Sequence, residues 1–291
     1  MKTKVFYFSG TGNTYVLAKE LAKKINAEIA SMPEVMETAK IHIESEIIVL
    51  VFPSYLALLS GLPMIVERFV RAIENIGDFT IFGVCNCGGY EIVNALPSLK
   101  KLRRIVRSCG GNLYAEYSLR LPMNNLDYDH IPIPINRNSE DIIRKSKFEI
   151  DRISNSIMKR KKTRYKMLKN MFLIIMDPMF KSMRPAIVKE LREKAHEPAD
   201  TRLPYNELIP LTDKSIRVDD QCTGCGICAK VCPVGNIRIV DGRPEFQHRC
   251  EMCFACDEWC PANAVHHWSR KNGVKYHHPE VHLKDMMKNE T

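Results

Sequence analysis

The chain has 291 residues, 45% of them hydrophobic and 26% charged, with a formal net charge of +9. This composition excludes a largely disordered chain and allows one large domain or two smaller ones. The N-terminus, MKTKVFYFSGTGN, has too short an apolar stretch for a signal peptide, so we expect a cytoplasmic protein. Of its 11 cysteines, the eight clustered between Cys222 and Cys260 are expected to bind metal rather than form disulfides.

Strand and helix patterns alternate through the first half of the chain. Apolar runs predict strands, and apolar residues at helical spacing predict helices. The predicted elements are strand 4–8, helix 14–25, strand 47–52, helix 63–76, strand 78–84, helix 90–109, strand 113–119 and helix 139–158. This alternation predicts a doubly wound parallel sheet with helices on both faces, and ligands at the carboxyl ends of its strands.

One apolar stretch, residues 47–66, is almost long enough to span a membrane. Pro53, Gly61 and Pro63 interrupt it, and a membrane span needs continuous backbone hydrogen bonding. We therefore predict a buried strand, a loop and the start of a helix here.

The region 161–212 differs in composition from the residues before it. Between Arg152 and Met176 all charged side chains are basic, and an apolar run, Met171–Phe180, overlaps the end of this stretch. We predict a linker that packs between domains. A second interpretation is peripheral association of Arg152–Lys169 with an anionic membrane surface or an acidic partner protein. No nucleic-acid-binding motif is present, so we expect no nucleic-acid partner.

The C-terminal part carries two cysteine motifs with the spacing C-x2-C-x2-C-x3-C-P. The first has Cys222, Cys225, Cys228 and Cys232, and the second has Cys250, Cys253, Cys256 and Cys260. The offset between counterparts is the same for all four cysteines, which indicates an internal repeat and two similar halves. A zinc site is the alternative, but structural zinc sites favour separated C-x2-C pairs rather than two runs of four cysteines.

These motifs resemble bacterial-type ferredoxins with two [4Fe–4S] clusters, over about residues 213 to 267. In that family the fourth cysteine of each motif binds the cluster of the other motif. The resemblance implies that one cluster is bound by Cys222, Cys225, Cys228 and Cys260. It implies that the second cluster is bound by Cys250, Cys253, Cys256 and Cys232.

A polar loop with the sequence SGTGNT follows the first predicted strand. It lacks the lysine of an ATP-binding loop, and Tyr15 replaces the third glycine of a dinucleotide-binding loop. Backbone N–H groups, hydroxyls and a helix N-terminus suit a terminal monophosphate. A loop that caps the helix without a ligand is the alternative. The candidate phosphate-binding residues are Ser9, Gly10, Thr11, Gly12, Asn13 and Thr14.

SGTGNT resembles the FMN phosphate loop of flavodoxins, which implies a sheet with strand order 2-1-3-4-5 and two further loops around the flavin ring. The second loop is predicted within 53–63 and the third within 85–90. Their candidate flavin contacts are Pro53, Ser54, Tyr55, Asn86, Cys87, Gly88, Gly89 and Tyr90. We interpret Cys85 and Cys87 mainly as small packing residues, since free cysteine behaves as a small hydrophobe.

The whole chain thus resembles fused flavodoxin–ferredoxin proteins. The predicted domains are an FMN-binding domain over 1–160, a linker over 161–212, a small α+β two-cluster ferredoxin domain over 213–268 and a tail over 269–291. The resemblance implies FMN, two [4Fe–4S] clusters and a redox partner protein. We expect an electron relay in low-potential anaerobic-type metabolism. A flavin-dependent reductase of a small molecule and a redox sensor are the alternatives.

Overall fold

The computed structural model describes residues 2–36, 40–123, 139–162, 167–270 and 275–287, without the side chains at 167–170, 172–174 and 176. Contacts divide the chain into two compact units. The described residues up to Lys181 form the first unit, except Gly10–Gly12 and Met123, which group with the described residues from Ser182 onward.

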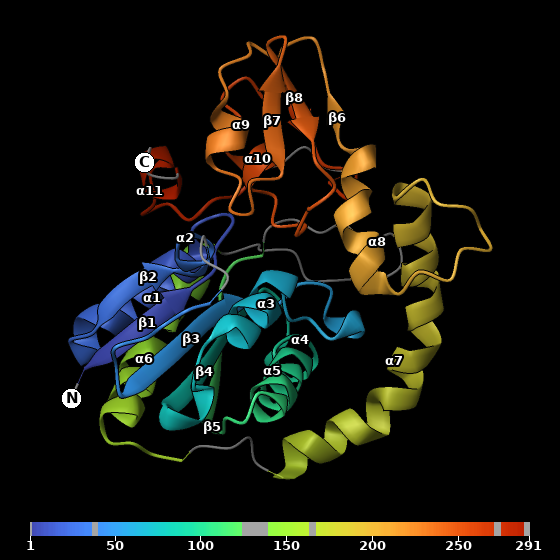
Figure 1. Cartoon of the computed structure of the whole chain (residues 1–291). Coiled ribbons are helices and arrows are strands. Elements are labelled where there is room, and N and C mark those ends of the chain that lie inside the picture. The colour runs from blue at the N-terminus through green and yellow to red at the C-terminus, as the bar shows by residue number, and fades with distance from the viewer. Residues whose placement is uncertain (1, 37–39, 124–138, 163–166, 271–274, 288–291) are drawn as a thin grey trace. The chain divides into compact units, whose positions relative to one another are not determined.

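A five-stranded sheet lies at the centre of the first unit (Figure 1). Its strands are β1 (Thr3–Tyr7), β2 (Glu28–Ser31), β3 (Ile47–Pro53), β4 (Thr80–Cys87) and β5 (Leu113–Arg120). All neighbouring strands are parallel, in the order β2-β1-β3-β4-β5. The predicted order 2-1-3-4-5 is confirmed. Because the chain changes direction across the sheet between β1 and β3, their carboxyl ends mark the expected ligand site.

Helices cover both faces of this sheet (Figure 1). On one face, α1 (Asn13–Ile25) and α6 (Ser139–Met158) contribute Leu17 and Ile153 to a core cluster shared with Val49 of β3. On the other face lie α3 (Met64–Ala72) and α5 (Leu96–Ser108). The Phe69 ring of α3 lies 5.0 Å from the Phe6 ring of β1. Because both faces are covered, β3 is buried along its whole length, as its continuous apolar run predicts.

Two predicted elements have different limits in the structure. Strand β4 begins at Thr80 and extends through Cys87, so Cys85, Asn86 and Cys87 lie in a strand rather than in a loop. Their pairing with both neighbouring strands, β3 and β5, explains the extension. The helix predicted over 63–76 ends at Ala72, because Ile73 is extended and forms a bridge with Ile41.

The helix predicted over 90–109 is broken into two. A short α4 (Glu91–Asn94) precedes α5, and Ala95 lies between them. Pro97 lies in the first turn of α5 and has no N–H group to continue the helical hydrogen bonds from α4. The prediction of one continuous helix was therefore wrong, although its C-terminal limit is close to the observed one.

The segment predicted as a linker, 161–212, contains helices. Helix α7 spans Met167–Lys194 and α8 spans Tyr205–Leu211, followed by a 3-10 turn over Thr212–Ser215. Residues 163–166 of the basic stretch lie outside the described residues. In the described part of the chain, no helix is both long enough and apolar enough to cross a membrane.

The second unit contains the cysteine motifs and short elements. These are β6 (Arg217–Val218), α9 (Ile227–Lys230), β7 (Ile237–Val240), β8 (Arg243–Phe246), α10 (Ala255–Glu258), β9 (Val265–His266) and α11 (Leu283–Met286). β6 pairs with β9 and β7 pairs with β8, both antiparallel. Helices α9 and α10 are separated along the chain by the same offset as the cysteines, so the internal repeat is visible in the backbone.

Candidate functional site

The eight motif cysteines form two groups of neighbours. Cys228 is close to Cys222, Cys225 and Cys260, each of which acts electrostatically on its thiol. Likewise, Cys256 is influenced by Cys250, Cys253 and Cys232. We name these sets the first thiol group (Cys222, Cys225, Cys228, Cys260) and the second thiol group (Cys250, Cys253, Cys256, Cys232). Each group takes three cysteines from one motif and the last cysteine from the other.

The thiols differ in how strongly burial affects them. Burial, together with neighbouring cysteines, raises the pKa of the Cys228 thiol to about 11 and that of Cys253 to about 12. Burial also raises the pKa values of Cys250 and Cys256 well above their ordinary values. Buried thiols of this kind become thiolates when a metal withdraws their protons, because metal ligation requires the deprotonated form.

Backbone N–H groups point at the sulfur atoms of both groups. The N–H of Asn236 donates to Cys232 Sγ at 3.2 Å, and that of Ala264 donates to Cys260 Sγ at 3.3 Å. These two donors occupy equivalent positions of the repeat. The last cysteine of each motif, which belongs to the thiol group of the other motif, therefore accepts an equivalent hydrogen bond. The N–H of Met252 adds a bond of 3.3 Å to Cys250 Sγ. Hydrogen bonds to ligand sulfur are typical of iron–sulfur sites.

The loops that carry the thiols share an unusual backbone conformation. Positive φ occurs at Gly224, Gly226 and Gly235 in the first half. It recurs at the equivalent positions of the second half, which are Met252, Phe254 and Asn263. Non-glycine residues rarely adopt this conformation, and it is retained where the surrounding structure imposes it. The two loops therefore turn in the same way despite different side chains.

Both thiol groups fit the donor set of a [4Fe–4S] cluster. Each supplies four cysteines, and such a cluster is bound by four thiolates. Within the described ranges, no three His, Cys, Asp or Glu side chains are arranged to hold a single metal ion. A cluster binds each cysteine at a different iron atom, so its ligands need not converge on one point.

Charged side chains surround the second thiol group. The Asp213 carboxylate is buried, and it accepts hydrogen bonds from Asn236 Nδ2 at 2.8 Å and from the His248 N–H at 3.0 Å. His248 Nδ1 lies 2.7 Å from the other carboxylate oxygen. Asp213 is close enough to Cys250 to disfavour its thiolate electrostatically. Asp213 is therefore linked to two cysteines of this group, to Cys250 directly and to Cys232 through Asn236.

A second network of charges surrounds α10. Asp257 Oδ2 accepts from Arg270 Nε at 2.7 Å, and Arg270 also bonds to Glu258. Lys275 Nζ donates to the Asp257 carbonyl at 2.6 Å and lies 3.6 Å from Asp257 Oδ1. Burial raises the pKa of Glu258 to about 7, although Arg270 opposes this shift. The network joins α10, which carries Cys256, to the chain beyond Cys260.

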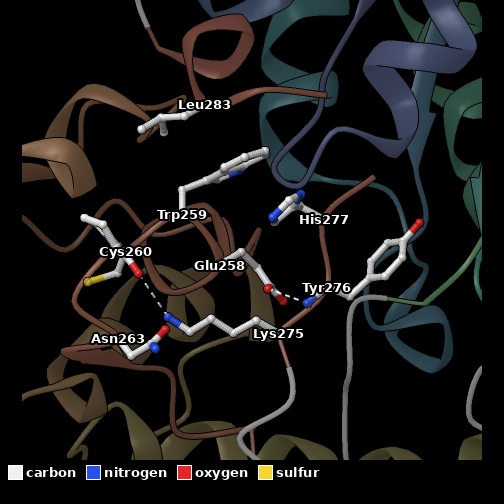
Figure 2. Close-up of a pocket in the computed structure, with 9 residues that line it drawn as sticks. Glu258, Trp259, Cys260, Asn263, Lys275, Tyr276, His277 and Leu283 are labelled. Atoms are coloured by element: carbon white, nitrogen blue, oxygen red, sulfur yellow. Dashed lines mark hydrogen bonds between the residues drawn. The ribbon is translucent and has the colours of Figure 1, made fainter. Parts of the chain in front are cut away.

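An open pocket of about 510 Å³ lies next to Cys260 (Figure 2). Lys275 crosses it and donates to the Cys260 carbonyl at 3.5 Å, while the Tyr276 N–H donates to Glu258 at 2.6 Å. The Trp259 and His277 rings stack with centroids 4.3 Å apart. The pocket thus brings solvent close to the backbone of one cysteine of the first thiol group.

In the first unit, the three predicted flavin loops meet at Asn86. Thr14 Oγ1 donates to Asn86 Oδ1 at 2.7 Å, and the Ser54 N–H donates to the Asn86 carbonyl at 2.9 Å. Asn13 Nδ2 donates to the Pro122 carbonyl at 2.7 Å, which ties the start of α1 to the segment after β5. The structure therefore brings these residues together at the carboxyl ends of the strands, with the Asn13 and Thr14 side chains engaged in protein contacts.

The remaining residues of the first loop are divided between the units. Ser9 belongs to the first unit, whereas Gly10, Thr11 and Gly12 group with the second. Gly12 has a φ of +93°, a conformation that suits glycine. The first turn of α1 contains no acidic residue, so no side-chain carboxylate there opposes an anion at its N-terminus.

The second predicted loop has a constrained backbone. The Tyr55 N–H donates to the Gly61 carbonyl at 2.8 Å and closes the loop that follows Pro53. Leu56 and Ser60 have φ values of +47° and +103°. A side chain at Gly61 would lie 2.2 Å from Ser98 Oγ. Such strained backbone conformations are common at ligand sites.

The two predicted aromatic contacts lie in different surroundings. The Tyr55 ring is 6.2 Å from the Phe8 ring, nearly perpendicular to it. Tyr90 is 69% exposed and follows Gly88 and Gly89, directly before α4. An exposed aromatic ring in this position is available to a ligand, whereas Tyr55 also serves to pack the loop.

Cys85 and Cys87 are buried in β4. Burial, together with Glu91, raises the pKa of Cys87 to about 12, and burial raises the pKa of Cys85 well above its ordinary value. Thiols with raised pKa values are poor nucleophiles. Their burial agrees with a role in packing. Cys87 is the last residue of β4, so it lies next to the third predicted flavin loop.

Sequence reasoning missed the charged residues around the thiols, among them Asp213, Arg243 and Arg270. Arg243 of β8 donates to the Asp219 carbonyl at 2.7 Å, and its guanidinium is close enough to Cys222 to interact with it electrostatically. Comparison of the two halves of the repeat could have indicated some of these charged residues. Alignment of the two halves on their cysteines places Asp257 and Glu258 opposite Ala229 and Lys230, which marks where the halves differ.

Comparison with known proteins supports the assignment of the cysteine motifs. Residues 214–261 match the family model of the 4Fe-4S dicluster domain. The chain is 42% identical over 45 residues to a protein of the ion-translocating oxidoreductase complex of Methanosarcina acetivorans, covering 15% of this chain and 17% of that protein. It is 37% identical over 54 residues to an uncharacterized ferredoxin of Methanocaldococcus jannaschii, covering 19% and 30%. The chain thus spans less than a third of the curated relatives it matches.

Solved structures resemble the first unit. A flavodoxin from the domain Archaea is 20% identical, covering 55% of this chain and 98% of its own, with a TM-score of 0.35. A flavodoxin of Streptococcus pneumoniae is 17% identical, covering 51% and 94%, with a TM-score of 0.32. At these scores the flavodoxin-like assignment rests on the strand order. The first unit therefore has a flavodoxin-like fold, and residues 214–261 match a 4Fe-4S dicluster domain.

Proposed function

We propose that this protein is an electron carrier that relays electrons between FMN and two [4Fe–4S] clusters. The observation that carries this proposal is the pair of thiol groups, each with four cysteines drawn from both motifs. The first thiol group would hold one cluster and the second thiol group the other. Clusters of this type transfer single electrons without binding an organic substrate.

The flavin would bind at the carboxyl ends of β1, β3 and β4. The N-terminus of α1 would accept its phosphate, because helix N-termini favour anions. The backbone around Ser54, Tyr55 and Gly88 would border its ring, and Asn86 holds these loops together. When bound, FMN can accept two electrons and release them one at a time. The residues of these three loops would bind and orient the flavin.

Fusion of the two parts in one chain supports a relay. A covalent connection keeps the flavin and the clusters at a high effective concentration, so electron exchange between them need not await a collision. The physiological partner would be a redox protein, which the basic stretch Arg152–Lys169 suits if that partner is acidic. The cytoplasm and low-potential anaerobic-type metabolism are the proposed setting.

Stopped-flow spectroscopy tests the carrier function. The chain is reduced anaerobically and mixed either with an oxidised low-potential ferredoxin or with small oxidants, namely a quinone, a nitro compound and a disulfide. A carrier oxidises rapidly with the protein acceptor and slowly with the small molecules. Rapid multiple turnover with one small oxidant and no protein acceptor contradicts a pure carrier and supports a flavin-dependent reductase.

The matched variants are Cys225→Ala and Cys109→Ala. Cys225 belongs to the first thiol group, whereas Cys109 lies at the end of α5, outside both groups. Loss of Cys225 should slow oxidation by the protein acceptor, and loss of Cys109 should leave the rate unchanged. Equal rates in both variants would show that the first thiol group takes no part in the relay.

A further inference from the structure

The two halves of the cysteine repeat carry different charges around equivalent cysteines. The clearest difference concerns the first cysteine of each motif. Arg243 is close enough to Cys222 to interact with its thiol electrostatically. The counterpart of Cys222 is Cys250, which lies near the buried carboxylate of Asp213. That carboxylate accepts a hydrogen bond from Asn236, whose N–H donates to Cys232 Sγ. A cation beside a ligand sulfur stabilises the added electron of a reduced cluster, and an anion destabilises it.

Further positions of the repeat change charge in the same direction. Glu251 acts electrostatically on Cys253, and the equivalent residue of the first half is the neutral Thr223. Asp257 acts on Cys256, and its counterpart is Ala229. The second thiol group therefore has a carboxylate near each of the three cysteines of its own motif.

Other charges reduce this difference, including Arg249, which precedes Cys250 and whose counterpart in the first half is the neutral Gln221. Arg270 and Lys275 are ion-paired with Asp257, which weakens its effect on Cys256. In the first half, Asp219 and Asp220 lie near Arg243. Asp220 is fully exposed, Arg243 is itself about half exposed and lies 2.9 Å from Asp220, and Asp219 accepts a hydrogen bond of 2.6 Å from His266. Exposed charges are screened by solvent far more than buried ones. The buried carboxylates Asp213 and Glu251 therefore have the stronger influence.

We propose that the cluster held by the first thiol group has the higher reduction potential. This inference rests on the proposed function, since it requires both clusters. One electron given up by the cluster at the second thiol group is taken up by the cluster at the first, and no proton or bond is involved. A single electron on this unit therefore resides at the first thiol group, whose Cys260 borders the open pocket (Figure 2).

An anaerobic redox titration of the full chain, followed by EPR spectroscopy at about pH 8, tests the order. The wild type should show two cluster potentials. Arg243→Gln should lower the higher one and leave the lower one nearly unchanged. Thr223→Glu, at an exposed position where a carboxylate is tolerated, should also lower the higher potential, because it gives the first half the charge of the second. Glu251→Gln should raise the lower potential.

The control is Arg238→Gln, which removes the same charge from the exposed face of β7. It should leave both potentials nearly unchanged. Two equal potentials in the wild type, or a shift of the lower potential in Arg243→Gln and Thr223→Glu, would overturn the inference. Iron analysis of each sample separates this result from the proposed function: about eight irons per chain with the wrong order contradicts only the inference. About four irons contradicts the proposed function itself.

Discussion

His267 is a buried histidine in the second unit whose environment excludes a charge. Its ring lies 4.4 Å from the Phe254 ring, and its Nδ1 lies 2.9 Å from Ser269 Oγ. Within the described residues its Nε2 has no hydrogen-bond partner. Burial, with a smaller contribution from Arg270, lowers the pKa of His267 to about 3, although Asp257 opposes the shift. The imidazole is therefore neutral in the folded protein at ordinary pH.

This histidine should make the second unit sensitive to acid. Unfolded histidine binds a proton near pH 6.5, whereas folded His267 binds one only near pH 3. The unfolded state thus binds more protons between these values, so stability present above about pH 6.5 is lost as the pH falls. By about pH 5 the loss from this group is about 2 kcal/mol, at about 1.4 kcal/mol per pH unit.

Urea unfolding at about pH 7 and pH 5 measures this effect. His267→Gln should lose about 2 kcal/mol less stability than the wild type between these two values. The control, His42→Gln, changes an exposed histidine and should keep the wild-type pH dependence. An identical acid sensitivity in His267→Gln and the wild type would show that this residue binds a proton equally in both states.

At the scale of elements, the glycines of the first cysteine loop are not equivalent. Gly224 and Gly242 both have positive φ, +69° and +72°. A side chain at Gly224 would lie 2.8 Å from the Gly242 carbonyl oxygen, whereas nothing lies within 4 Å at Gly242. Met252 occupies the position equivalent to Gly224, with a φ of +53°, so the backbone conformation alone does not require glycine.

Gly224→Ala should therefore disrupt the first thiol group, while Gly242→Ala should not. The first variant adds a clash with backbone, and we expect about four irons per chain instead of about eight. The second variant adds only the cost of a positive φ, about 1 kcal/mol, and should keep its iron. Iron analysis of both proteins decides this, and a Gly224→Ala protein with full iron would refute the steric argument.

Most elements of the first unit were predictable because their apolar patterns are strong. β3 is a continuous apolar run, and α6 has the predicted limits, Ser139–Met158. β2 was missed because it is a short edge strand, EIAS, without apolar alternation. Helix α7 was missed because Pro178 and Pro185 lie inside it, and proline ordinarily ends a helix. In β2, pairing with β1 outweighed the weak local preference.

The candidate site was predictable only where spacing carries the chemistry. The cysteine spacing indicated iron–sulfur ligands, and the resemblance to two-cluster ferredoxins implied the exchange of the fourth cysteines found in the two thiol groups. The charges beside them were not predictable, because Asp213 and Arg243 reach the thiols from outside the motifs. Likewise, the contact between Thr14 and Asn86 joins residues far apart in the sequence, and no local pattern indicates it.

For the whole molecule, the account depends on two kinds of cofactor in one chain. The strand order of the first unit and the 4Fe-4S dicluster match of residues 214–261 are independent observations: the first agrees with a flavin site at the ends of the strands, and the second with iron–sulfur clusters. A chain that contained only one cofactor type could not relay electrons between a flavin and clusters. The numbers of clusters and flavins bound per chain therefore decide whether the proposed relay is possible.

Analysis of anaerobically purified protein for iron, acid-labile sulfide and flavin is the most direct test. The account predicts about eight irons, about eight sulfides and about one FMN per chain, in agreement with two filled thiol groups and one flavin site. Release of the flavin by heat and chromatography distinguishes FMN from FAD. A chain with about four irons, with FAD in place of FMN, or with clusters but no flavin would contradict the account.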